Sequence, residues 1–125
     1  MENTLFAYFE NQLFPFPVQP QLRDSLQLFL YDCCIPNNGD TPFYRRVVQR
    51  KLDTIPQDDR ERYFQHYAQL HTVQVIAENF SITGQIAEKD RRILCSLLPT
   101  LERAGLLRYV SPLLWKQRLY YDLLP

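Results

Sequence analysis

Glycine, methionine and cysteine are scarce in this sequence, which has 3 glycines, 1 methionine and 3 cysteines among 125 residues. So few glycines leave neither a Gly-rich flexible linker nor a Gly-rich loop of the kind that cradles phosphates. The odd cysteine count, with Cys33 and Cys34 adjacent, does not make the disulfide framework of a secreted scaffold. It is typical of a reducing compartment, so we expect a cytoplasmic location.

Catalytic and metal-binding motifs are also missing: there is no Gly-x-Ser-x-Gly elbow and no His-Glu-x-x-His pair. His66 and His71 are five positions apart, whereas ligands that share a helix face are three or four apart. Asp58 and Asp59 are explained by the start of a helix, where the dipole favours acids. We therefore expect no enzyme activity, no metal and no cofactor.

Long hydrophobic runs are absent, and the longest fall far short of the roughly 20 residues that a membrane-spanning helix requires. The first 13 residues contain Glu2 and Glu10 and have no basic region, unlike a signal peptide. These features predict a soluble protein without a membrane segment.

Net charge is also absent, because 14 basic residues balance 14 acidic residues. Since cations that neutralise phosphates supply most nonspecific nucleic-acid affinity, this balance argues against a general nucleic-acid binder. The charge is uneven: residues 1–40 have one base and five acids, and residues 84–125 have seven bases and four acids. Opposite charges at the two ends are consistent with self-association.

Apolar residues are abundant, at 46%, and aromatic residues make up 14%, which is enough for a single folded domain over residues 1–125. Helical spacing of apolar residues and proline-containing breaks divide the chain into N-terminal helices (1–55) and a second part (56–125). We expect helices at residues 2–14, 21–34, 41–54 and 57–79, a short helix at 83–88, and a last helix that ends near 104. Pro99 should kink or restart that last helix.

Two aromatic, apolar segments follow Gly105, at residues 106–110 and 114–121, with Ser111-Pro112 between them. They predict two strands and a turn. The predicted fold is mainly α, a compact bundle of five to six helices with a C-terminal β-hairpin.

Residues 81–121 contain the pair Ile86-Ala87 and, further on, the helix ending Leu101-Glu102-Arg103-Ala104-Gly105-Leu106. With these residues the segment resembles the winged helix-turn-helix family. The resemblance implies a recognition helix followed by a wing, with DNA contacts from Arg91, Arg92, Thr100, Lys116 and Arg118. Pro99 and the apolar wing depart from a DNA-reading helix and wing, and in related modules such a wing serves protein contact.

Aromatic and arginine side chains gather near the C-terminus, and these residue types are enriched at binding hot spots. The candidate partner-binding residues are Phe16, Tyr109, Trp115, Arg118, Tyr120 and Tyr121. Whether Trp115 belongs to the core or to a contact surface is left open. We predict a non-enzymatic protein–protein interaction module, an adaptor or regulatory subunit that self-associates as a homodimer. The alternative is a small winged-helix-type DNA-binding transcriptional regulator.

A smaller basic patch, Arg45-Arg46 with Arg50-Lys51, lies on the third expected helix, where Arg46 and Arg50 are four residues apart and share a face. The buried face of this helix is expected to contain Phe43, Val47, Val48 and Leu52. The arginines fit either a solvated helix face or a site for an acidic partner, including the acidic N-terminal half of a second copy.

Overall fold

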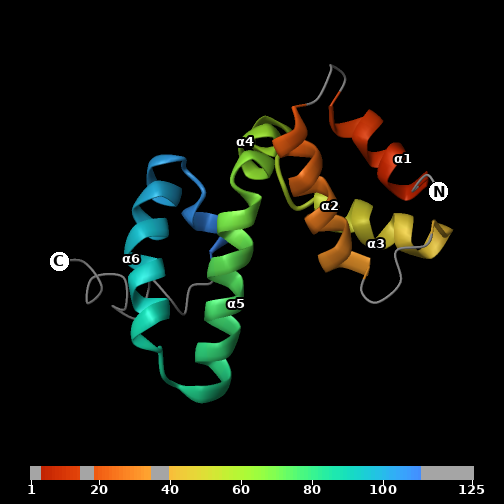
Figure 1. The fold of residues 1–125 in the computed structure, drawn as a ribbon. Helices are drawn as coiled ribbons and strands as arrows, with labels where there is room; N and C mark the ends of the chain where they lie inside the picture. Colours follow the sequence, from red (N-terminus) through yellow and green to blue (C-terminus); the bar gives the residue numbers. More distant parts are fainter. Residues whose placement is uncertain (1–3, 15–18, 35–39, 111–125) are drawn as a thin grey trace. The chain divides into compact units, whose positions relative to one another are not determined.

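Helices form nearly all of the regular structure in the computed structural model, which describes residues 4–14, 19–34 and 40–110. In chain order the elements are α1 (Thr4–Leu13), α2 (Pro20–Cys34), α3 (Pro42–Leu52), the 3-10 turn η1 (Gln57–Asp59), α4 (Arg60–Gln65), α5 (Tyr67–Thr83), α6 (Glu88–Arg103) and the 3-10 turn η2 (Leu107–Tyr109). The prediction of a mainly α fold is confirmed for this part of the chain (Figure 1).

Contacts divide the chain into two units, Met1–Tyr67 and Ala68–Pro125. Each unit has its own buried apolar residues. They are mostly aromatic and leucine side chains in the first unit and mostly leucine, valine and isoleucine in the second.

Helix α2 is the centre of the first unit, because it packs against α1, α3 and α4. Its buried residues Leu22, Leu26, Phe29 and Leu30 recur at helical spacing on one side. Helix α2 spans Pro20–Cys34, close to the predicted range of residues 21–34.

Aromatic rings surround Phe29, which is fully buried. The ring centroids of Phe64, Tyr67 and Tyr63 lie 5.2, 5.5 and 6.4 Å from that of Phe29, each in an edge-to-face arrangement. Such pairs add to the stability gained from the buried apolar area itself. The Phe29 cluster therefore joins α2 to α4 and to the first residue of α5.

The expected single helix over residues 57–79 is wrong, because the structure has three elements there. The chain leaves helical geometry at His66, whose φ is −112° and ψ is 15°, between α4 and α5. Residues of α4 are buried in the first unit, whereas residues of α5 beyond Tyr67 are buried in the second. Both parts have apolar residues at helical spacing, so the pattern alone does not reveal the break.

In the second unit, α5 and α6 run in opposite directions and are joined by residues 84–87 (Figure 1). The expected short helix at residues 83–88 does not form. Helix α5 instead continues to Thr83 and ends at Gly84, which has a φ of +71° and donates a 2.8 Å backbone hydrogen bond to Phe80. A positive φ at this position is readily accepted by glycine.

Helix α6 ends as the glycine predicts. The N–H of Gly105, with φ +73°, donates to the carbonyl of Glu102, and the N–H of Leu106 donates to that of Leu101. These two bonds form a Schellman motif, which commonly includes an apolar contact across the helix end. Leu101 and Leu106 are both fully buried.

The predicted C-terminal β-hairpin is wrong, because the described residues contain no strand and its first expected strand is a helical turn. The N–H groups of Tyr109 and Val110 donate to the carbonyls of Leu106 and Leu107, which closes η2. Leu106 and Val110, four residues apart, are both buried. This spacing places two side chains on one side of a strand as well as of a helix, so the sequence pattern does not separate the two conformations. The second expected strand, residues 114–121, lies outside the described residues.

Pro99 neither restarts nor ends α6, which continues from Glu88 to Arg103 with the proline inside it. Proline has no N–H to donate to the carbonyl of Cys95. The helix keeps its register because Leu94, Leu98 and Leu101 are buried along one side.

Candidate functional site

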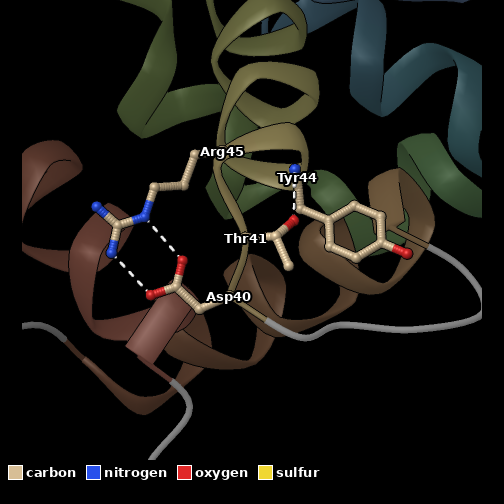
Figure 2. A network of polar contacts seen from close by, with 4 residues as sticks. All are labelled: Asp40, Thr41, Tyr44 and Arg45. Carbon is tan, nitrogen blue, oxygen red and sulfur yellow. Dashed lines mark hydrogen bonds and ion pairs between the residues drawn. The ribbon is translucent and has the colours of Figure 1, made fainter.

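The N-terminus of α3 is fixed by Thr41, which precedes the helix (Figure 2), and by Pro42, its first residue. The hydroxyl oxygen of Thr41 accepts a 3.1 Å hydrogen bond from the backbone N–H of Tyr44, and Pro42 occupies the first turn. Both are favoured at helix starts, since the cap satisfies a free N–H and proline has none to satisfy. The sequence predicts this start correctly.

Asp40 and Arg45 form a bidentate ion pair across this first turn, with both N···O distances at 2.7 Å (Figure 2). The hydrogen bond with Asp40 raises the pKa of Arg45 above its usual value. The Arg45 guanidinium also lies over the ring of Tyr8, 4.1 Å from its centroid. Arg45 is thus occupied within the first unit, where it joins α3 to α1.

Another side of α3 is exposed and contains two arginines that differ from Arg45 in having no partner among the described residues. Val48 and Leu52 are buried, whereas Arg46 and Arg50 are exposed and have no hydrogen bond or ion pair within the described part of the chain. Phe43 is 60% exposed, and its ring meets that of Tyr44 edge-on at 5.6 Å. We call the three exposed residues Phe43, Arg46 and Arg50 the α3 face.

Phe43 corrects an expectation, since the sequence analysis places it on the buried side. It lies five residues before Val48, and five residues turn a helix by about 500°, which places the two on different sides. The spacing of Phe43, Arg46 and Arg50 (i, i+3, i+7) is the signal that identifies the exposed side.

The charge of α3 is uniformly positive. The helix has four basic residues and no acidic one, and only Arg45 is paired with an acid among the described residues. An acidic side chain, Asp53, follows at the C-terminal end and accepts a 2.9 Å hydrogen bond from Gln49. The positive charge therefore lies between two flanking carboxylates, Asp40 before the helix and Asp53 after it, and two of the four bases, Arg50 and Lys51, are in the last turn.

Tyr109 is the one predicted partner-binding residue that lies within the described residues. It is partly buried in η2, and the guanidinium of Arg108 lies 5.4 Å from its ring centroid. The other predicted partner-binding residues, Phe16, Trp115, Arg118, Tyr120 and Tyr121, lie outside the described residues, as does Lys116 of the predicted nucleic-acid-binding set.

The predicted nucleic-acid residues on α6 do not share one side of the helix. Arg91 is partly buried, whereas Arg92 is exposed and pairs with Glu88 at 3.6 Å. The hydroxyl of Thr100 donates to the carbonyl of Ser96 and accepts from Arg103 at 3.4 Å.

The outer side of α6 consists mainly of Lys89, Arg92, Ser96 and Arg103, all exposed. They lie opposite Leu94 and Leu98, as helical spacing requires. Lys89 and Arg103 are not among the predicted nucleic-acid-binding residues. Their helical spacing from Arg92 and Ser96 is the sequence signal that places them on the same side of the helix.

No cluster of His, Cys, Asp or Glu in residues 4–14, 19–34 and 40–110 is suited to hold a metal ion. Over the same residues, no helix combines the length and the apolar character needed to cross a membrane.

Comparison with protein-family models, with curated protein sequences and with solved structures finds no match to this chain.

Proposed function

We propose that this protein is a non-enzymatic protein–protein interaction module, an adaptor or regulatory subunit that works in the cytoplasm. The observation that supports this most directly is the α3 face, where a 60% exposed phenylalanine lies beside two exposed arginines. Aromatic and arginine side chains supply much of the binding energy at protein interfaces. Among the described residues of the first unit, none forms a hydrogen bond or an ion pair with Arg46 or Arg50, and the buried residues Val48 and Leu52 lie on the other side of α3.

Self-association is part of this proposal and is supported by the outer side of α5. Ile82 and Val75 are 83% and 42% exposed and lie seven residues apart on the side opposite Val73 and Ala77. Two apolar side chains on one exposed stripe fit a homodimer contact.

The test is a pull-down from source-cell lysate with the full chain as bait, with and without nuclease, read by mass spectrometry. Sedimentation of the purified chain, whose monomer mass is 15.0 kDa, is measured alongside. We expect protein partners that survive nuclease treatment, and a mass about twice that of the monomer. Loss of every partner with nuclease would contradict an interaction module, and a monomer at all concentrations would contradict the dimer.

A second candidate, a small DNA-binding regulator, is supported by the basic outer side of α6. Lys89, Arg92 and Arg103 place three cations there, beside the hydroxyl of Ser96. A phosphate binder loses affinity steeply as salt rises. The charge-reversing variant R92E/R103E would abolish such binding, whereas it should leave protein capture through α3 unchanged.

A further inference from the structure

We infer that the α3 face binds an acidic segment of a partner protein, in which two carboxylates one helical turn apart pair with Arg46 and Arg50 and an apolar side chain covers Phe43. This inference rests on the proposed function and adds the chemistry of the partner.

The two arginines are spaced to hold two carboxylates. They lie at i and i+4, so their Cβ atoms are roughly 6 Å apart on one side of the helix. Acidic residues three or four apart on a partner helix, or two apart on an extended strand, have a similar separation. Each guanidinium can donate two parallel hydrogen bonds to a carboxylate, and no described side chain already accepts from Arg46 or Arg50.

The comparison with Arg45 shows why these two arginines are the free ones. All three belong to the same helix, but Arg45 has Asp40 at 2.7 Å and the ring of Tyr8 at 4.1 Å. An acidic partner would supply Arg46 and Arg50 with carboxylate acceptors, as Asp40 does for Arg45. The ion pair of Arg45 with Asp40 is thus an observed contact, on the same helix, of the kind that we infer for Arg46 and Arg50.

Phe43 determines the rest of the partner's chemistry. It lies nearly one turn before Arg46 on the α3 face, with 60% of its surface exposed. A carboxylate alone leaves this ring in water, whereas a leucine or an aromatic residue beside the acids covers it. The partner segment therefore combines acids with one apolar anchor.

A nucleic acid fits this surface less well than a protein does. Asp53 follows the C-terminal end of α3, where a continuous phosphate backbone would meet its negative charge. Two arginines also give few phosphate contacts, and such contacts set nonspecific affinity. A short acidic segment can end before Asp53.

The test uses fluorescence anisotropy with the full chain and three labelled probes. The first is an alanine-based helical peptide with a central leucine, flanked on both sides by glutamates one and two turns away on the same face. The second has lysine in place of each glutamate, and the third is a DNA duplex of similar length. The variants are R46E/R50E and F43A, and R92E/R103E is the matched control with the same change of charge.

We expect the glutamate peptide to bind, and R46E/R50E to weaken it about tenfold or more, as for loss of two hot-spot residues. R46E/R50E should in turn bind the lysine peptide, F43A should weaken the glutamate peptide several-fold, and R92E/R103E should change neither. Because all three residues are exposed, circular dichroism should show unchanged helix content. If R46E/R50E does not fold, R46Q/R50Q replaces it.

Failure of the glutamate peptide to bind, equal binding by R46E/R50E, or equal binding of the lysine peptide by the unchanged chain would overturn the inference. Binding of the duplex that depends on Arg46 and Arg50 would overturn it in favour of nucleic acid. The proposed function fails separately: if nuclease-resistant partners remain on R46E/R50E, the chain is an interaction module that uses another surface.

Discussion

The hydroxyl of Tyr67 donates a 2.7 Å hydrogen bond to the carboxylate of Asp32, in a partly buried position beside Phe29. Burial raises the pKa of Tyr67 well above its ordinary value of 10.0, and the hydrogen bond to Asp32 raises it further. The folded chain therefore holds the phenolic proton where the unfolded chain would release it.

This shift makes stability depend on pH in the alkaline range. The stabilisation is complete below about pH 10, where both states are protonated, and it falls as pH rises above that value. At neutral pH, Tyr67→Phe should lower the free energy of unfolding by about 1 kcal/mol, because the hydrogen bond is lost.

Urea denaturation of both proteins from neutral to alkaline pH measures this effect. The difference in stability between the original chain and Tyr67→Phe should shrink as pH rises above about 10. Tyr31→Phe, at an exposed position on α2, is the control and should change little. A difference that stays constant with pH would contradict the role assigned to Tyr67.

The exposed position of Phe43 can be predicted from the sequence only in part. Its spacing from Arg46 and Arg50 in the sequence indicates that the three residues share one side of the helix. An apolar residue near a helix start, however, is normally predicted to be part of the core. Phe43 is exposed because Val48 and Leu52 lie on the buried side of α3, which packs against α2, and Phe43 lies about 140° from Val48 around the helix.

At the scale of elements, helix ends were the most predictable feature. Thr41-Pro42 begins α3, and Gly105 ends α6. Local chemistry decides both, since capping, proline and positive φ act within a few residues. The course of a helix through an interior proline is harder to predict, since α6 continues through Pro99.

Replacing Pro99 with alanine should raise the free energy of unfolding by about 1 to 3 kcal/mol, because alanine restores an N–H donor to the carbonyl of Cys95 and removes the clash of the ring. Urea denaturation measures the change. Ser96→Ala, on the exposed side of the same helix, is the control and should have a smaller effect. A loss of stability in Pro99→Ala would mean that packing of the ring matters more than the missing hydrogen bond.

At the scale of the whole molecule, the chain has two buried cores, one centred on Phe29 and one that includes Leu98. Contacts concentrate within each unit, and cooperative opening commonly follows such units. Truncating one core should therefore affect that unit first.

Hydrogen exchange measured by mass spectrometry tests this on Phe29→Ala and Leu98→Ala. Each removes a fully buried side chain at a cost of about 2 to 5 kcal/mol. We expect Phe29→Ala to speed amide exchange mainly in α2 and α4, and Leu98→Ala mainly in α5 and α6. Equal acceleration of all four helices by both variants would show a single cooperative unit instead.

The sequence alone determined that this protein is mainly helical and where several helices end, because proline, glycine and capping residues act locally. Tertiary structure decided the break at His66, the exposed position of Phe43 and the helical turn at Leu107–Tyr109. In each of these cases the local pattern fits two conformations. The choice depends on which side chains the rest of the fold buries, and that is a property of residues distant in the sequence.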